Sequence, residues 1–327
     1  MFDLRRREFI TLLGGVAVLP LAARAQRSGK IYRMGFLGVT SHAEYSDRVE
    51  AVRTGLRQLG YEESKNIVIH YRWAEGRYDR LPELAAELVQ LNVDVIVTHS
   101  TPGSRAAKQA TSTIPIVANS GDPVEAGLVG SLARPGGNLT GTTFFFAEVC
   151  AKRVELIKEA IPTLARLAVL VNPANASNRI ALSAMQRTAG SLGVELVPVE
   201  VTTRDDIAVV PAMVIARKAS ALVVIEDPVS ISSDRWTAEL MLQNRLPTIG
   251  FKPHAKAGAL MDYGVDVTDQ FYRLAAFVDK ILKGSPPADL PIERAVKFDL
   301  VVNLKSAKTL GIELPSSLLI RADEVIE

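Results

Sequence analysis

Short apolar runs rich in β-branched residues alternate with longer stretches of helical period from residue 30 onward. Runs of this kind are typical of buried strands, and apolar residues at intervals of three and four are typical of amphipathic helices. Strands that alternate with such helices form right-handed crossovers and parallel sheets covered on both faces. The pattern predicts strands at 31–37, 67–72, 93–98, 114–118, 167–171, 195–199, 221–225 and 247–250. Between them it predicts helices near 44–60, 79–91, 102–111, 123–133, 177–192, 205–218 and 232–245.

The two halves of this pattern resemble each other. Leu59-Gly60-Tyr61 and Leu192-Gly193-Val194 each end a predicted helix and lead into a strand. The repeat predicts an α/β protein of two similar Rossmann-like lobes. A further strand at 258–263, helix at 268–283 and strand at 297–303 are left over, which indicates that the chain crosses back through a hinge of several strands. We expect one lobe to hold residues 26–142 and about 257–290, and the other to hold 143–256 and about 291–327.

The first 25 residues have the organisation of an export signal. Three arginines at 5–7 precede an apolar run at 9–23, which is shorter than the roughly 20 residues of a membrane span. Small residues at Ala23 and Ala25 give the spacing that a signal peptidase cleaves. The string RRREFI resembles the twin-arginine signal, and an ordinary secretory signal is the alternative. We expect a periplasmic, exported protein with no stable membrane insertion after residues 1–25 are removed.

Composition and charge exclude several classes of protein. The 327 residues are 48% apolar and 23% charged, enough for about two domains with cores of their own. Residues 26–327 hold 34 basic and 34 acidic side chains, a balance that argues against a nucleic-acid partner. The single Cys150 and four scattered histidines do not match a zinc site. No catalytic motif is present either, so we assign no catalytic residue, metal ion or cofactor.

Small polar and acidic residues follow the carboxyl ends of the predicted strands, where parallel α/β sheets bind ligands. We expect Ser100 and Asp122 to cap the helices at 102–111 and 123–133. Two interpretations remain open, helix capping alone or contact with a solute. Hydroxyls and free N–H groups at a helix start favour a carboxylate, and acidic side chains favour an amino group. The candidates are Gly38, Ser41, Ser100, Thr101, Ser120, Asp122, Asn172, Glu226 and Asp227.

Several segments are similar to a known family. YRWAEGRYDRLPELAAELV, DPVEAGLVGSLARPGGNLTG and KFDLVVNLKSAKTLGIELPSSLL, together with the leader REFITLLGG, resemble the ABC-transporter substrate-binding proteins related to the tryptophan- and tyrosine-binding proteins. The resemblance covers residues 31–327. It implies the type I periplasmic-binding-protein fold, with two lobes hinged by crossing strands, one small-molecule solute in the cleft, and an ABC transporter permease as the partner.

The resemblance also implies which loops form the cleft. They hold Ser100-Thr101, Ser120 to Asp122, Asn172, Glu226-Asp227 and the turn Asp262-Tyr263-Gly264, and Phe144 to Phe146 lie at the lobe crossover. The phenylalanines either favour an aromatic or aliphatic solute or serve as hinge packing.

We therefore expect a solute-binding protein without catalysis, for an amino acid or an aromatic or aliphatic acid or amide. One alternative is an enzyme on the same fold, which would need a nucleophile–base pair in the cleft. The other alternative is a periplasmic sensor that presents its lobes to a membrane receptor.

Overall fold

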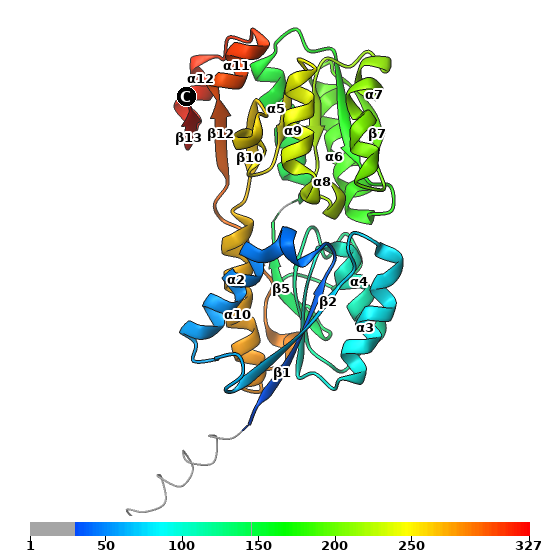
Figure 1. Cartoon of the computed structure of the whole chain (residues 1–327), viewed down its shortest axis with the longest axis vertical. Coiled ribbons are helices and arrows are strands. Elements are labelled where there is room, and N and C mark those ends of the chain that lie inside the picture. Colours follow the sequence, from blue (N-terminus) through cyan, green and yellow to red (C-terminus); the bar gives the residue numbers. More distant parts are fainter. Residues whose placement is uncertain (1–29, 145) are drawn as a thin grey trace, which may run out of the picture.

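Two α/β lobes are joined by chain connections that pass between them (Figure 1). The computed structural model describes residues 30–144 and 146–327, so the predicted export signal lies outside the described residues. Each lobe is built on one sheet with helices on both faces, which confirms the predicted fold class. Within the described residues, no helix is both long enough and apolar enough to cross a membrane.

Lobe 1 has a six-stranded sheet in the order β11-β5-β4-β3-β1-β2, in which all neighbouring strands are parallel. Helices α2 and α10 cover one face, and α3 and α4 cover the other. The strands are β1 (Tyr32–Gly38), β2 (Ile67–Trp73), β3 (Val95–His99), β4 (Ile116–Ser120), β5 (Leu139–Thr143) and β11 (Glu293–Arg294). The helices are α2 (His42–Gln58), η1 (Tyr78–Arg80), α3 (Leu81–Gln90), α4 (Ser100–Ala110), α10 (Val267–Leu282) and η4 (Pro287–Asp289).

Lobe 2 has a seven-stranded sheet in the order β13-β12-β10-β9-β8-β6-β7, with β12 antiparallel to β10. The strands are β6 (Arg166–Val171), β7 (Glu195–Glu200), β8 (Leu222–Val224), β9 (Thr248–Gly250), β10 (Met261–Gly264), β12 (Asp299–Asn303) and β13 (Glu324–Ile326). The helices are α5 (Phe146–Ala160), α6 (Ala176–Ser191), η2 (Asp205–Val209), α7 (Val210–Ala216), α8 (Pro228–Ser232), α9 (Asp234–Gln243), η3 (His254–Ala257), α11 (Leu304–Leu310) and α12 (Ser316–Arg321).

The central strands are mostly apolar because both faces of each sheet are covered. In β3, Val95 and Val97 pack under α2 and α10, whereas Ile96 packs under α3 and α4. In β6, Val169 and Leu170 likewise enter different cores. Successive side chains of a strand point to opposite faces, so a strand covered on both sides shows a continuous apolar run.

The repeat in the sequence corresponds to a repeat in topology. The order β2-β1-β3-β4-β5 in lobe 1 matches β7-β6-β8-β9-β10 in lobe 2. The carboxyl ends of β3 and β4 in one lobe and of β8 in the other therefore face the region between the lobes, which is where the site is found.

The chain crosses between the lobes three times, after β5, β10 and β11. The second and third crossings differ from the expected boundaries. Residues 261–264 form β10, which pairs with β9 and β12 in lobe 2, although 257–290 was expected in lobe 1. Residues 293–294 form β11, which pairs with β5 in lobe 1, although 291–327 was expected in lobe 2. Strand pairing decides these memberships, and the sequence pattern does not encode it.

The prediction of a helix at 123–133 is wrong. Residues 123–127 form turns, with the Leu128 N–H donating to the Pro123 carbonyl at 2.8 Å. Gly127 has a φ of 68°, which a helix does not allow. Leu128 and Val129 instead pack into the core under α3 and α4. The pattern also missed α5, which provides the buried Arg153 described below.

Candidate functional site

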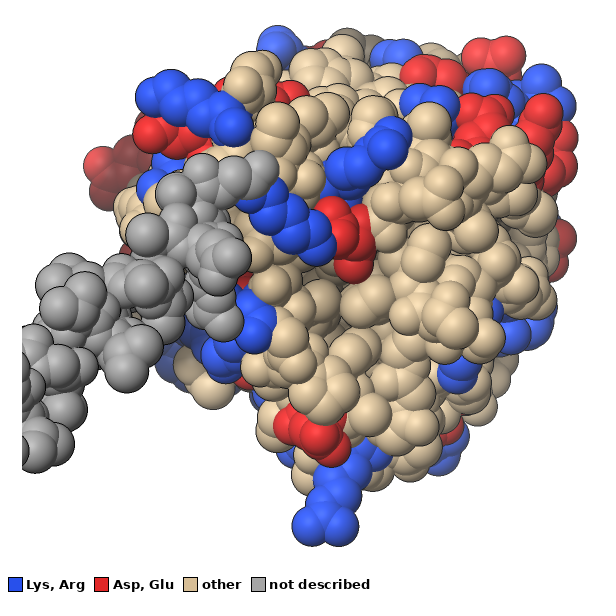
Figure 2. Space-filling model, turned by 90° about the horizontal axis from the view of Figure 1, so that it is seen from below, with Lys and Arg blue, Asp and Glu red and all other residues tan. Residues whose placement is uncertain are grey.

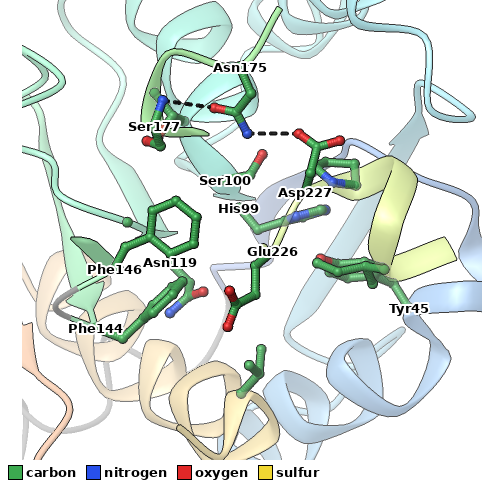
Figure 3. Close-up of a pocket in the computed structure, with 15 residues that line it drawn as sticks. Tyr45, His99, Ser100, Asn119, Phe144, Phe146, Asn175, Ser177, Glu226 and Asp227 are labelled. Carbon is green, nitrogen blue, oxygen red and sulfur yellow. Dashed lines mark hydrogen bonds between the residues drawn. The ribbon is translucent and has the colours of Figure 1, made fainter. Parts of the chain in front are cut away.

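A cavity between the two lobes opens to the surface, and it contains about 490 Å³ of space outside protein atoms when the open solvent at its mouth is included. Its walls come from the carboxyl ends of β3, β4 and β8, from the β5–α5 connection, and from the first turns of α2, α4, α6, α8 and α10. Figure 3 shows these side chains converging from both lobes. The lining residues are Tyr45, His99, Ser100, Thr101, Asn119, Gly121, Phe144, Phe146, Asn175, Ser177, Glu226, Asp227, Pro228, Ile231 and Val267.

His99 places an unpaired hydrogen-bond donor in the cavity wall. The Val39 N–H donates to His99 Nε2 at 3.0 Å, so the neutral ring carries its hydrogen on Nδ1. Burial lowers the pKa of His99 to about 3, which keeps the ring neutral. The ring stacks on Tyr45 with centroids 4.0 Å apart. Nδ1 has no hydrogen-bond partner among the described residues, so a solute is a suitable acceptor for it.

Ser100 opens α4 in a backbone conformation that is uncommon for a residue with a side chain. Its φ is 60°, in the left-handed region. The sequence predicts Ser100 as an N-cap, and this prediction is wrong, because Ser100 is the first residue of α4. The N-cap is His99, which makes no side-chain capping bond. The Ser100 hydroxyl is also without a partner among the described residues. The free N–H groups of this helix start and the hydroxyl together favour an anionic group.

Glu226 is fixed by a fully buried arginine. Arg153, in α5, donates from Nη1 to Glu226 Oε2 at 2.6 Å and from Nη2 to the other carboxylate oxygen, so the pair is bidentate. Arg153 Nε donates to the Tyr263 carbonyl at 2.8 Å. The Arg153 side chain is 0% exposed and that of Glu226 is 9% exposed. Glu226 therefore lines the cavity with a carboxylate whose orientation is fixed by Arg153, a residue that does not line the cavity.

Asp227 is saturated by four donors. Its carboxylate accepts from Asn172 Nδ2 at 3.0 Å, Asn175 Nδ2 at 2.9 Å, the Val229 N–H at 3.0 Å and the Tyr78 hydroxyl at 2.7 Å. Burial raises its pKa, and these hydrogen bonds act in the opposite direction. Asp227 is thus the N-cap of α8, and its carboxylate is fully used in protein hydrogen bonds. The carboxylate of Glu226 accepts from Arg153 and so has fewer protein partners than that of Asp227.

Aromatic rings form the apolar wall of the cavity. Phe144 and Phe146 meet edge to face, with ring centroids 5.7 Å apart. Both residues are buried and both line the cavity. Phe145, the third residue of the predicted aromatic run, lies outside the described residues. Phe144 and Phe146 also belong to the core of lobe 2, so they serve in hinge packing and cavity lining at once.

The structure brings five of the twelve sequence candidates to the cavity, namely Ser100, Thr101, Phe144, Glu226 and Asp227. The other seven have different surroundings. Gly38 packs against the Trp73 ring, Ser41 caps α2 together with Glu44, and Ser120 is the buried end of β4. Asn172 supports Asp227, and Tyr263 and Gly264 lie against Arg153.

Asp122, the seventh of these, contacts a backbone group instead of the cavity. Its Oδ2 accepts from the Ala147 N–H at 3.1 Å, at the start of α5. Burial raises the pKa of Asp122 to about 6. The expected capping of a helix at 123–133 is therefore wrong, and Asp122 holds the first turn of α5 in the other lobe.

Sequence reasoning missed several lining residues, among them Tyr45, His99, Asn119, Ser177, Ile231 and Val267. His99 was detectable, because it directly follows the predicted strand at 93–98 and carries a polar ring; in the structure it is the last residue of β3. Tyr45 and Val267 lie in the first turns of helices and had no such signal, since an apolar residue there is normally core.

The chain was compared with known proteins. Residues 34–326 match the sequence profile of the ABC transporter substrate binding proteins. A tyrosine-binding protein from Clostridioides difficile (strain R20291) is 26% identical over 288 residues, which cover 88% of this chain and 83% of that protein.

Two solved structures are also similar. One is an ABC domain from Streptococcus pneumoniae in complex with L-Trp, with a TM-score of 0.83 and 25% identity over 91% of this chain and 100% of that one. The other is a ligand-free, open substrate binding protein from Clostridium difficile, with a TM-score of 0.64 and 26% identity over 90% of this chain and 99% of that one. Together with the profile match and the two-lobed fold, they show that this chain belongs to the ABC transporter substrate-binding proteins and binds a solute.

Proposed function

We propose that the solute is a small zwitterion with an apolar body, such as an amino acid with an aromatic or aliphatic side chain. The carrying observation is the Glu226 carboxylate in the cavity wall, held in place by the buried Arg153. Among the described residues, no lysine or arginine lines the cavity, whereas two carboxylates do. A solute of net negative charge would bring no cation of its own to Glu226, whose cationic partner Arg153 lies outside the cavity lining. An ammonium group would pair with it.

The other charge of the solute has a matching place in lobe 1. The start of α4, the Ser100 hydroxyl and the His99 Nδ1–H are donors without protein partners among the described residues. A solute carboxylate there would accept hydrogen bonds and interact favourably with the positive end of the helix dipole. Because Glu226 belongs to lobe 2, the two charges of one zwitterion would be bound by different lobes, and binding would draw the lobes together.

The body of the solute would lie against apolar side chains. Phe144, Phe146, Ile231 and Val267 line the cavity, and Figure 3 shows the rings of Phe144 and Phe146 together on one side of it. Burial of an aromatic or aliphatic group there supplies affinity that a small polar amino acid lacks. The names of the tyrosine-binding relative and of the L-Trp complex agree with this class of solute.

We propose binding without catalysis. A nucleophile–base pair would require a hydroxyl or thiol hydrogen-bonded to a base. The Ser100 hydroxyl and His99 Nδ1 both lack hydrogen-bond partners within residues 30–144 and 146–327, so they do not bond to each other. Burial raises the pKa of the Cys150 thiol well above its usual range, which leaves it un-ionised.

A matched series of compounds tests the solute class. We expect L-phenylalanine to bind, 3-phenylpropionate to bind at least about 100-fold more weakly because it has no ammonium to pair with the carboxylate of Glu226, and 2-phenylethylamine to lie between them. Thermal shift gives the first measurement, since a ligand at 100 times its Kd stabilises by about 2.7 kcal/mol. Titration calorimetry then gives each Kd.

L-Leucine, L-tryptophan and L-serine serve as controls for the apolar body. L-Serine carries the same head group without that body and should bind weakly. Tighter binding of 3-phenylpropionate than of L-phenylalanine, or binding of a sugar in preference to all of them, would contradict the proposed solute class.

We also propose that the protein works in the periplasm and delivers its solute to an ABC transporter permease. The family match supports the permease partner. The arginines at 5–7 and the apolar run at 9–23 support export. Export before folding by the general route and export after folding by the twin-arginine route are distinguishable experimentally.

Replacing Arg6 and Arg7 together by lysine should leave the precursor in the cytoplasm if the twin-arginine route is used. Cell fractionation with an antibody against the protein measures the distribution. Replacement of Lys30 by arginine, beyond the apolar run, is the control and should not alter it. Normal export of the double variant would assign the protein to the general secretory route.

A further inference from the structure

The donors to Asp227 come from both lobes. Asn172, Asn175 and Val229 all belong to lobe 2, as does Asp227 itself. The fourth donor is the hydroxyl of Tyr78, which lies in η1 of lobe 1 and reaches Asp227 Oδ2 at 2.7 Å. Tyr78 is therefore the one donor that Asp227 would lose if the lobes moved apart.

Tyr78 is outside the solute cavity. It lines two neighbouring grooves at the rim of the cleft, whereas Asp227 lines the cavity itself. A change at the Tyr78 hydroxyl therefore removes no contact with a solute. It changes the connection between η1 in lobe 1 and the polar groups of lobe 2 around the carboxylate of Asp227, at the start of α8.

The lobes are in contact at a second polar pair nearby. The hydroxyl of Thr101 in lobe 1 is hydrogen-bonded to the hydroxyl of Ser177 in lobe 2, and both residues are buried. The fold superposes with a TM-score of 0.83 on the L-Trp complex and 0.64 on the ligand-free, open protein, at nearly equal identity. The lobe arrangement of this chain is thus the more similar to that of the complex.

We propose that Tyr78 is a positioning residue for solute capture, whose hydroxyl holds the lobes closed through Asp227 without touching the solute. The proposal rests on the solute-binding role of the family and not on the identity of the head group.

The surroundings of Asp227 suit this role. Three fixed donors in lobe 2 orient the carboxylate, so an oxygen is presented to Tyr78 at little further loss of side-chain entropy. Burial and the neighbouring Asp227 raise the pKa of Tyr78 well above its usual range, so the phenol stays a donor. A bond that exists only in the closed state raises the population of that state, and solute escapes only when the lobes open.

The test is Tyr78→Phe, which keeps the ring and removes the hydroxyl. Small-angle X-ray scattering of the solute-free protein should give a larger radius of gyration for Tyr78→Phe than for the wild type. With L-phenylalanine as the probe, stopped-flow dissociation should be about 10-fold to 100-fold faster, the range expected for losing a hydrogen bond to a charged group. The association rate should change much less.

Tyr61→Phe is the matched control. The Tyr61 hydroxyl donates to Asp279 Oδ1 at 3.0 Å, so the same chemical bond is removed, but both residues lie in lobe 1 and both are buried. This variant should lose stability without any change in the radius of gyration or in the dissociation rate. Circular dichroism checks that both variants are folded.

The scattering result separates this proposal from the proposed solute. If L-phenylalanine fails to bind, the solute class is wrong, and the radii of gyration still decide the role of Tyr78. Equal radii for the wild type and Tyr78→Phe overturn the proposal, and so does an equal expansion in Tyr61→Phe.

Discussion

Replacing Arg153 by methionine is expected to lower the free energy of unfolding by about 3–5 kcal/mol, because the Glu226 carboxylate is left in a largely buried place without its cation. Methionine keeps most of the apolar volume of the side chain, so cavity formation adds little. The loss also frees the Tyr263 and Val224 carbonyls, which accept from Arg153. Urea denaturation followed by circular dichroism measures the change.

The partner variant Glu226→Gln should also be destabilising, because it leaves the buried guanidinium of Arg153 without its carboxylate. The double variant Arg153→Met, Glu226→Gln should recover much of the stability, because no isolated charge remains. Binding of L-phenylalanine should stay at least about 100-fold weaker in the double variant, since its ammonium has lost Glu226. The double variant thus separates the structural role of the pair from the binding role of Glu226.

The exposed pair Arg166–Glu195 in the same lobe provides the control. Its side chains are 34% and 57% exposed, and Arg166→Met should change stability by only about 1 kcal/mol or less. If the losses of stability in Arg153→Met and Glu226→Gln simply added up in the double variant, the two side chains would not be energetically coupled, contrary to this prediction. Full affinity in the double variant would show that Glu226 does not bind the solute.

The second large effect is a loss of stability as the pH rises, caused by Asp262. This residue of β10 is 1% exposed, its Oδ2 accepts from the Ala255 N–H at 2.8 Å, and its Oδ1 has no partner among the described residues. Burial raises the pKa of Asp262 to about 8, against the opposing effects of the Ala255 N–H and of Arg153. The folded protein therefore keeps this proton at a pH where the unfolded chain has released it.

The sign follows from proton linkage. Between about pH 4 and pH 8 the folded state binds one more proton at Asp262 than the unfolded state, so stability decreases with pH by at most about 1.4 kcal/mol per unit. The contribution of Asp262 is largest below pH 4 and is lost as the pH passes 8. Asp262→Asn removes the titrating group and should remove this slope.

Urea denaturation of the wild type and Asp262→Asn at pH 5, 6, 7 and 8 measures the difference between them. Other groups titrate equally in both proteins, so the difference isolates Asp262. We expect the stability of Asp262→Asn relative to the wild type to increase steadily over this range. A difference that does not vary with pH would mean that Asp262 is ionised in the folded protein.

The candidate site was partly predictable because strand ends are partly predictable. Ser100, Thr101, Glu226 and Asp227 follow buried apolar runs, and parallel sheets bring such positions to one edge. Their roles were not predictable in the same way. Glu226 and Asp227 are adjacent acidic residues, yet one meets Arg153 and the other meets Tyr78 and two asparagines.

The sequence by itself determined the class of fold and the repeat, because periodicity is a local property and a strand buried on both faces is apolar at most of its positions. It also determined the family, through segments that span the chain.

Only the tertiary structure decided which strands pair and which side chains contact each other. Residues 123–133 form turns and bends instead of a helix, with Leu128 and Val129 packed into the core of lobe 1, and β10 joins lobe 2 through pairing with β9 and β12. Arg153 and Glu226 lie 73 positions apart, and Tyr78 and Asp227 lie 149 apart. Contacts at such separations depend on how the lobes pack and close, which no local pattern of hydrophobic and polar residues records.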